Sequence, residues 1–417
     1  MSQPVISEDA SPARALWRNR DFLMLWSGQS ISTVGTGVSQ FAMPLLVLAL
    51  TRSPALAGFV TAVRQSPYLL FSLPAGALID RWDRKAVMIR CDVVRWLALG
   101  SLPLAFALGH LTLAQVFVVA FVEGTAYVLF SLAQISALPQ VVDPAHLSRA
   151  YSLDTANEYA GALLGPALGA FVIGLAPFIE MGTMFAYLMD SVSYLISVIS
   201  LRFIRVSFQK DRAPAEASRG SLRAEIAEGL RFLWGQRRLR LMVLLTTAIN
   251  FLQSSLTLSV IVLGRASLHL DVQTLGFVVS AGGMGGVLGA VLAPVLRARL
   301  RFGQVIIGAV LLWAVAVLLL VVAPTAALVV VGYGLANLLW PIYGVTLVSY
   351  RLELTPDALQ GRVNSAFRFL SYGAEPLGAA VGGALLAALG PRPVLGLIAA
   401  GLALCALVSL GTELRTV

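Results

Sequence analysis

The chain has 417 residues, of which 58% are hydrophobic and only 12% are charged, and its mean hydropathy is +0.83. Soluble domains contain roughly 45–50% apolar and about 25% charged residues, so this composition excludes an ordinary water-soluble protein. In a soluble protein the net charge of +9 would indicate a nucleic-acid partner. In a membrane protein it reflects cationic residues in cytoplasmic loops, and we expect no nucleic-acid binding.

Apolar segments recur twelve times, six on each side of a polar stretch. Because unsatisfied backbone groups are costly in hydrocarbon, segments of about 20 residues without strict alternation predict helices. We therefore expect an all-α membrane protein with twelve transmembrane helices in two six-helix bundles. The expected spans are 22–50, 55–79, 86–109, 112–139, 150–176, 181–204, 240–263, 274–296, 303–323, 325–350, 361–389 and 392–412.

The lysine and arginine distribution predicts the orientation. With the N-terminus inside, the inner segments hold 24 of these cations and the outer loops hold only Arg52, Arg265 and Arg392. This bias places both termini in the cytoplasm of a protein of the plasma (inner) membrane. The expected parts are a tail at 1–20, a first bundle at 21–204, a cytoplasmic linker at 205–239, a second bundle at 240–412 and a tail at 413–417.

The linker carries a helical pattern, because Leu222, Ile226, Leu230 and Leu233 follow one another at spacings of four, four and three. One interpretation is an amphipathic helix on the inner membrane face, whose arginines contact anionic lipid. These arginines are Arg223, Arg231, Arg237 and Arg238. The other interpretation is a tether between the halves that merely follows the charge rule.

An internal repeat relates the two halves. Three positions recur at an offset of 212 residues, namely Pro144, Leu147 and Gly161 with Pro356, Leu359 and Gly373. The fifth and eleventh helices are therefore the same element in two halves, as expected of a two-bundle transporter.

The segment after the second helix reads Gly76-Ala-Leu-Ile-Asp80-Arg81-Trp-Asp-Arg84-Lys85. It resembles the loop signature G-x-L-x-D-R-x-G-R-[RK] of the major facilitator superfamily, with Asp83 in place of the usual glycine. The resemblance implies that these charges latch the cytoplasmic ends of the bundles and that Asp80 lies near the start of the eleventh helix. The motif residues are Gly76, Asp80, Arg81, Arg84 and Lys85.

The fifth helix reads Gly161-Ala-Leu-Leu-Gly165-Pro166-Ala-Leu-Gly169-Ala170. It is similar to the antiporter signature G-x-x-x-G-P-x-x-G-G of drug-exporting members, with Ala170 replacing the last glycine. Small residues four apart let helices approach closely. We expect a seam between the fifth helix and the glycine-rich eighth helix, although ordinary small-residue packing would give the same pattern.

Ionisable groups at membrane depth are the candidates for proton coupling. Glu123 lies about eleven residues, or roughly 16 Å, from the outer end of the fourth helix, which is near the membrane midplane. It is the first candidate, assisted by Arg64, and Glu158 and Asp154 follow. A permanent ion pair is the alternative role for each. Drug exporters with this signature often have an arginine in the fourth helix, and this chain has none there.

Three further groups are candidates for an interbundle gate. In the superfamily the second and eleventh helices adjoin, so the resemblance implies a pair between Arg64 and Glu375 that breaks as the cavity opens. Arg368 shares a helical face with Glu375 through its spacing.

A substrate cavity is expected near the midplane between the bundles. Its candidate residues are Gln29, Thr33, Gln40, Asn250, Gln253, Asn337, Trp340 and Tyr343. Aromatic walls with few polar groups suit a bulky amphipathic molecule better than a sugar. The same side chains would otherwise serve helix-to-helix hydrogen bonds.

The stretch Pro-Asp-x-Leu-x-Gly-Arg-Val from Pro356 to Val363, together with the antiporter signature, most resembles the enterobactin-exporter and macrolide-efflux branch of the superfamily. The implied activity is export of a small amphipathic or apolar compound (a drug, macrolide or siderophore-like molecule) by proton antiport. The alternatives are an uptake carrier of the same fold and a non-transporting membrane receptor or scaffold. We expect no enzymatic activity, no cofactor and no metal, since His110, His146 and His269 lack metal-ligand spacing. The expected partners are the substrate, protons and the lipid bilayer, with the protein as a monomer.

Overall fold

The structure is a computed structural model that describes residues 16–79, 82–209, 222–356 and 359–416, which fold almost entirely into helices. In chain order the helices are α2 (Arg20–Thr51), α3 (Pro54–Ile79), α4 (Arg84–Ala107), α5 (Leu113–Val141), η1 (Pro144–His146), α6 (Leu147–Gly174), α7 (Ile179–Phe203), α8 (Leu222–Gly235), α9 (Arg237–Gln253), α10 (Leu256–Val262), η2 (Leu263–Ser267), α11 (Val272–Arg299), α12 (Phe302–Val322), α13 (Ala326–Leu354), α14 (Gln360–Tyr372), α15 (Glu375–Leu389), α16 (Pro391–Leu410) and η4 (Glu413–Thr416). Helices cover all twelve apolar segments expected from the sequence.

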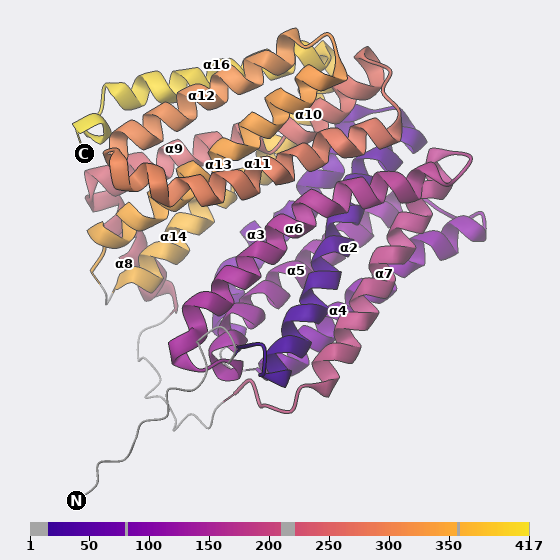
Figure 1. Cartoon of the computed structure of the whole chain (residues 1–417), viewed down its shortest axis with the longest axis horizontal. Helices are drawn as coiled ribbons and strands as arrows, with labels where there is room; N and C mark the ends of the chain where they lie inside the picture. The colour runs from indigo at the N-terminus through magenta and orange to yellow at the C-terminus, as the bar shows by residue number, and fades with distance from the viewer. Residues whose placement is uncertain (1–15, 80–81, 210–221, 357–358, 417) are drawn as a thin grey trace, which may run out of the picture.

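The helices gather into two groups that lie side by side (Figure 1). Helices α2 to α7 pack against one another, and helices α9 to α16 form the second group. The groups meet mainly where α6 packs on α11 and where α3 packs on α15. These two seams run on either side of the space in which a substrate site is expected.

Nine helical stretches of the described residues are long and apolar enough to cross a membrane. They are Arg20–Thr51, Leu113–Val141, Ile179–Phe203, Arg237–Ser267, Val272–Arg299, Phe302–Val322, Ala326–Leu354, Gln360–Leu389 and Pro391–Leu410. Helices α3, α4 and α6 occupy the other three expected segments. Charged residues such as Asp92 and Glu158 within α4 and α6 lower the hydropathy of those helices.

The outer surface of α12 shows why this protein needs a lipid solvent. Leu312, Leu318 and Val322 are 59%, 52% and 58% exposed, although water would not tolerate a continuous apolar face of this size. The opposite face of the same helix buries Trp313 and Leu320 completely. The chain is therefore a multi-pass membrane protein whose helices present apolar side chains to both the lipid and the protein interior.

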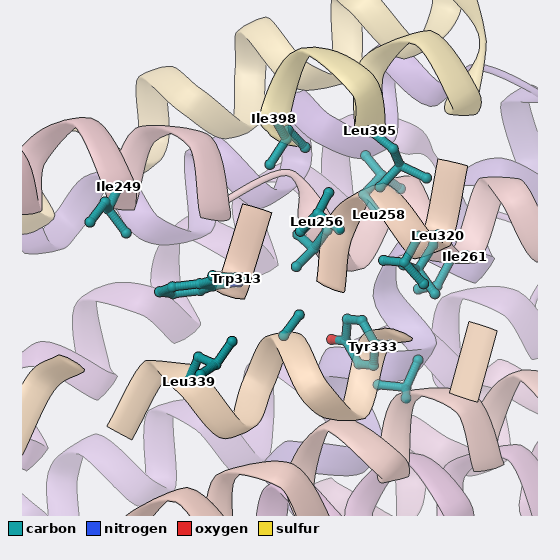
Figure 2. Close-up of a cluster of buried hydrophobic side chains, with 14 of the residues drawn as sticks. Ile249, Leu256, Leu258, Ile261, Trp313, Leu320, Tyr333, Leu339, Leu395 and Ile398 are labelled. Atoms are coloured by element: carbon teal, nitrogen blue, oxygen red, sulfur yellow. The ribbon is translucent and has the colours of Figure 1, made fainter. Parts of the chain in front are cut away.

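The core of the second group is built from side chains of α9, α10, α12, α13 and α16 (Figure 2). Trp313 of α12 lies in this cluster with Leu256 of α10 and Leu339 of α13. Its ring meets that of Trp340 edge-on, with 5.7 Å between the centroids. This contact holds Trp340 at the edge of the hydrophobic core.

Two of the expected continuous spans are interrupted. The segment 240–263 breaks between α9 and α10, and the segment 361–389 breaks between α14 and α15. The two breaks are neighbours, because the Nδ2 of Asn250 donates to the carbonyl oxygen of Ser371 at 2.9 Å. Thr247 similarly donates to the carbonyl oxygen of Leu370 at 3.3 Å. Side chains of α9 thus satisfy backbone groups that the end of α14 leaves open, as hydrocarbon requires.

The linker helix α8 packs on α14. Glu228 of α8 forms an ion pair with Arg362 at the start of α14, and Leu233 is fully buried. Just after α8, Arg237 binds Glu413 and Arg238 donates to the hydroxyl of Tyr350. These two arginines therefore bind protein groups, while the Arg237 side chain remains 66% exposed.

Asp83, the departure from the loop signature, is the N-cap of α4. Its carboxylate accepts a hydrogen bond from the backbone N–H of Ala86 at 3.0 Å. Aspartate and glycine are both favourable N-caps, so the substitution preserves the start of the helix.

Candidate functional site

A cavity of about 370 Å³ lies between the two groups of helices. The first half lines it from α2, α3 and α6, and the second half from α10, α11 and α13, with Ser254 between α9 and α10. The lining includes Gln40, Phe41, Pro44, Thr61, Arg64, Gln65, Tyr159, Thr257, Leu258, Tyr333, Asn337 and Trp340. Its volume falls within the range of small-molecule sites. We call it the central cavity.

The central cavity carries one ion pair at membrane depth. The Nε of Arg64 lies 2.6 Å from the Oε2 of Glu123, and Nη2 donates to Oε1 at 3.2 Å. The Arg64 side chain is 19% exposed and that of Glu123 is 5% exposed. Both residues lie ten positions from the neighbouring ends of their helices, Pro54 and Leu113, which is about 15 Å at the helical rise. Charges at this depth persist only with a partner or a cavity, and this pair has both.

Gly124 makes the pair possible. A Cβ atom at this position would overlap the carbonyl oxygen of Arg64, so only glycine lets α5 approach α3 so closely. The close approach puts the Glu123 carboxylate within reach of the guanidinium. The contact agrees with the expectation that Arg64 is the cation beside Glu123.

A second cavity of about 320 Å³ lies within the first half of the molecule, among α2, α4, α5 and α6. Its lining includes Gln29, Thr33, Arg95, Tyr127, Phe130, Gln134, Asp154 and Glu158, and it shares Gly37, Gln40 and Ala162 with the central cavity. We call it the inner-half cavity. The two carboxylates that followed Glu123 as proton-coupling candidates are therefore together, but apart from it.

Five of the eight expected cavity residues line these spaces. Asn337 and Trp340 line the central cavity, Gln29 and Thr33 line the inner-half cavity, and Gln40 lines both. The other three, Asn250, Gln253 and Tyr343, lie outside both cavities.

The predicted cavity lining is corrected at these three positions, and two of the side chains, Asn250 and Tyr343, form hydrogen bonds within the second half instead. The side-chain amide of Asn250 donates a hydrogen bond to the carbonyl oxygen of Ser371, next to the break between α14 and α15. The hydroxyl of Tyr343 is buried and shares a hydrogen bond of 2.7 Å with Thr246. Gln253 is the last residue of α9, and its buried Oε1 has no hydrogen-bond partner among the described residues. Polar residues in these spans therefore also serve helix-to-helix contacts, the alternative that the sequence left open.

The gate candidates are arranged differently from the expectation. Arg64 is paired with Glu123 and not with Glu375. The Arg368 guanidinium lies 5.8 Å from the ring centroids of both Tyr68 and Tyr372, whose rings are 5.4 Å apart. Arg368 thus bridges α14 of one half and α3 of the other through aromatic faces. Glu375 begins α15, where a carboxylate is favoured by the helix dipole.

Of the loop motif, Asp80 and Arg81 lie outside the described residues, and Gly76 lies in the last turn of α3. Arg84 donates to the carbonyl oxygens of Ser136 and Phe208 at 3.0 and 3.3 Å. Lys85 donates to the carbonyl oxygen of Ile204 at 2.6 Å. These two cations bind backbone carbonyls of their own half, near the ends of α5 and α7.

The glycines of the antiporter motif face α2, whereas Pro166 of the motif lies in the expected seam with α11. The glycines at 161, 165 and 169 face Thr33, Gly37 and Phe41 of α2, inside the first half. The seam with α11 exists, but Leu163, Pro166 and Ala170 form it from the α6 side, against Gly276 and Gly283. The motif glycines therefore hold α6 on α2, and the residues between them meet the other half.

Sequence reasoning missed Tyr159 and Tyr333, which line the central cavity from opposite halves. Tyr333 shares a hydrogen bond of 2.9 Å with Thr257 across α13 and α10. The sequence feature that could have identified these two tyrosines is an aromatic side chain with a polar end in the middle of a predicted span.

Comparisons with known proteins agree with this architecture. A family model described as transmembrane secretion effector, of the major facilitator superfamily (MFS), matches residues 11–417. The multidrug efflux pump Tap of Mycobacterium tuberculosis is 27% identical over 384 residues, covering 89% of this chain and 88% of that protein. Macrolide efflux protein A of Streptococcus pyogenes is 22% identical over 230 residues, which is 55% of each chain.

Solved structures show the same fold at low identity. The nucleoside transporter NupG superimposes with a TM-score of 0.73 at 15% identity, covering 94% of this chain and 98% of that one. An inward-facing bacterial homologue of the iron transporter ferroportin gives 0.72 at 16% identity, covering 94% and 98%. With its two helical groups, its interior cavity and the family match over nearly its whole length, the chain belongs to the transmembrane secretion effector family of the major facilitator superfamily and is a transporter, not an enzyme.

Proposed function

We propose that the protein exports a small amphipathic or apolar compound from the cytoplasm in exchange for protons, by alternating access. The proposal places all twelve helical segments across the plasma membrane, with both termini in the cytoplasm. The excess of cationic residues on the loops assigned to the inside supports this orientation. The relationship to two efflux proteins supports export over uptake.

The observation that carries the proposal is the Arg64–Glu123 pair beside the central cavity. A proton that binds the carboxylate removes its charge and with it most of the attraction to Arg64. Arg64 then becomes a buried cation without a partner, a state that a rearrangement of the helices around α3 relieves. Proton binding and the shape of the cavity are coupled in this way.

The two halves can move against each other only where few side chains protrude between them, and the glycine contacts at both seams meet this condition. A Cβ atom at Gly283 would overlap the backbone of α6 at Leu163, and one at Gly58 would lie 2.6 Å from the Ala379 carbonyl oxygen. Such close helix contacts favour sliding or rocking between two discrete arrangements. We infer that the halves 21–204 and 240–412 move as units about these seams.

The alternatives make different predictions for purified protein in liposomes. An uptake carrier moves substrate toward the side that holds the termini, and a receptor or scaffold moves nothing. The test is a flux screen over antibiotics, dyes and siderophores with an imposed pH gradient. We expect the gradient to drive accumulation of at least one amphipathic compound, and collapse of the gradient with a protonophore to abolish it. The absence of gradient-dependent flux for every compound would refute proton-driven export.

A further inference from the structure

Asp190 of α7 is a carboxylic acid in the interior of the first half, and it lines neither cavity. It follows Ile179, the first residue of α7, by eleven positions, which is about 16 Å at the helical rise and close to the depth of Glu123. Asp190 is 1% exposed. A Cβ atom at Gly35 of α2 would lie 2.5 Å from its Oδ1, so this glycine makes room for the carboxylate.

The surroundings of Asp190 offer little to an ionised carboxylate. No lysine or arginine in the described part of the chain forms an ion pair with it, and Arg95 acts on it only from beyond that distance. The hydroxyl of Ser193 lies 3.0 Å from Oδ1 but 2.7 Å from the Asp190 carbonyl oxygen, and it has one proton to give. Oδ2 is buried without a hydrogen-bond partner among the residues described. Burial of a charge in such surroundings favours the neutral, protonated acid.

The count of buried charges leads to the same conclusion. Three carboxylates of the first half, those of Asp92, Glu123 and Asp190, are at most 3% exposed. Arg64 pairs with Glu123 at 2.6 Å, and Arg95 lies 3.5 Å from Asp92. Because arginine stays charged in proteins, two anions balance these two cations and the third acid is neutral. Among the three, Asp190 lacks an arginine partner and therefore carries the proton.

Two buried tyrosines flank Asp190 on one face of α7. Tyr187 precedes it by three positions and Tyr194 follows it by four, and both side chains are fully buried. The Tyr187 hydroxyl has no hydrogen-bond partner among the described residues. It lies in the electrostatic range of Asp190 and also of Arg64 and Glu123. Tyr187 is therefore placed between the two acids.

Tyr194 connects the same face to the inner-half cavity. Its hydroxyl shares a hydrogen bond of 2.8 Å with Thr36 of α2, and Thr36 lines that cavity. At the other end of the row, Arg64 lines the central cavity. Hydroxyl and carboxyl groups thus follow one another through the interior of the first half, from one cavity to the other.

The helices packed on α7 bring few other charges to this row. They are α2, α4 and α6. Helix α2 carries charge only at its first two residues, and α4 contributes Asp92 and Arg95. The acids of α6, Asp154 and Glu158, line the inner-half cavity, where Arg368 of the second half acts electrostatically on Glu158. Glu123 is thus the acid that acts on Asp190 most directly from another helix.

We propose that Asp190 is a second proton carrier, placed between Glu123 and the inner-half cavity. Asp190 gives its proton to the hydroxyls of Tyr194 and Thr36, each of which passes its own proton on, and the last proton leaves through the cavity. Tyr187 then accepts the proton of Glu123 on its oxygen while its own hydroxyl proton moves to the Asp190 carboxylate. This inference rests on the proposed function and adds the route of the proton, which leaves the central cavity to the substrate.

Infrared difference spectroscopy of the full-length protein in liposomes tests the resident proton. At pH 7.5 the wild type should show the C=O stretch of a protonated carboxyl group that is absent from Asp190→Asn. The band should disappear as the pH rises. In Glu123→Gln it should disappear at a lower pH, because one anion fewer then balances the two arginines. This measurement needs no transported compound.

Flux in the same liposomes tests the role in transport, with ethidium as the amphipathic probe. Asp190→Asn should lose gradient-driven flux about tenfold and keep counterflow within about twofold of wild type, because counterflow needs no change in protonation. Glu353→Gln, which changes an exposed carboxylate of α13 outside both cavities, should affect neither measurement.

Two tyrosine variants test the route separately from Asp190. Tyr187→Phe and Tyr194→Phe each remove one hydroxyl and should slow gradient-driven flux about tenfold while keeping counterflow. The matched control is Tyr343→Phe, a buried tyrosine of the second half whose hydroxyl bonds Thr246. Thermal unfolding of every variant checks its folding.

Three results would overturn the inference. They are an unchanged carboxyl band in Asp190→Asn, gradient-driven flux at the wild-type rate in that variant, and an equal loss of counterflow and gradient-driven flux in all three variants, which would make the row purely structural. Wild-type flux that is independent of the gradient would refute the proposed proton antiport, whatever the variants do. Equal gradient-driven flux by the wild type and Asp190→Asn would refute this inference and leave the antiport standing.

Discussion

Arg64 of α3 and Glu123 of α5 meet in the middle of the membrane-spanning region through two contacts, of 2.6 and 3.2 Å. The guanidinium reaches the central cavity, while the carboxylate is almost fully buried behind it. In the proposed mechanism the pair connects Glu123, the proposed proton carrier, to Arg64, which lines the central cavity. Its geometry makes specific predictions for stability and transport.

A double-mutant cycle should detect the coupling between the two side chains. Glu123→Gln and Arg64→Gln each leave a charge without its partner, which costs about 3–5 kcal/mol for buried pairs. The double variant removes both charges and should be less destabilised than the sum of the singles by about 1 kcal/mol or more. Chemical unfolding in mixed micelles measures the free energy of unfolding of each variant. Additive effects would show that the pair is not coupled.

Gly124→Ala should be strongly destabilising, because the new methyl group overlaps the carbonyl oxygen of Arg64. Overpacking of this kind costs about 1–3 kcal/mol. The matched control is Gly308→Ala in α12, where a Cβ atom meets open space. There the higher helix propensity of alanine should be neutral or stabilising, by up to about 1 kcal/mol. Equal melting temperatures of the two variants would contradict the close approach of α5 to α3.

Asn250→Ala should loosen the break between α14 and α15. The carbonyl oxygen of Ser371 loses its donor, at a cost of about 1–3 kcal/mol. We expect faster hydrogen exchange in residues 371–378 and a lower melting temperature. Ser349→Ala is the control, since that exposed hydroxyl bonds only within its own helix. Unchanged exchange at the break in Asn250→Ala would show that this side chain does not support it.

Gly283→Ala should block transport by separating α11 from α6. The added methyl group overlaps the backbone at Leu163, so the seam between the halves cannot close as it does here. We expect at least a tenfold loss of flux in liposomes. Gly396→Ala in α16, where a Cβ atom meets open space, should transport normally. Full flux in the Gly283 variant would mean that the halves do not need this close contact.

The fold was largely predictable from the sequence, because apolar segments of sufficient length have few alternatives in a membrane. The interruptions within 240–263 and 361–389 were not predictable, because they depend on a hydrogen-bond donor from another helix. The Asn250 side chain, which donates to the carbonyl oxygen of Ser371, is the example. Pro376, directly after the second break, was the one local signal.

The site was predictable only in part, for a related reason. Residue counting along the fourth predicted helix put Glu123 near mid-span, but it did not show that Arg64 pairs with it and not with Glu375. Spacing also put Gly161 and Gly165 on one face, but it does not say which neighbour receives that face. The structure gives α2 as that neighbour, and only long-range packing could establish this.

Proton-driven flux by the Glu123→Gln variant in liposomes is the most direct test of the central claim, that Glu123 is the proton carrier. An imposed pH gradient should drive export by the wild type and by the control Glu353→Gln. The Glu123 variant should lose gradient-driven flux while retaining substrate counterflow within about twofold of wild type, because counterflow needs no change in protonation. Gradient-driven flux at the wild-type rate in this variant, at equal reconstitution, would contradict the assignment of Glu123 as the proton carrier.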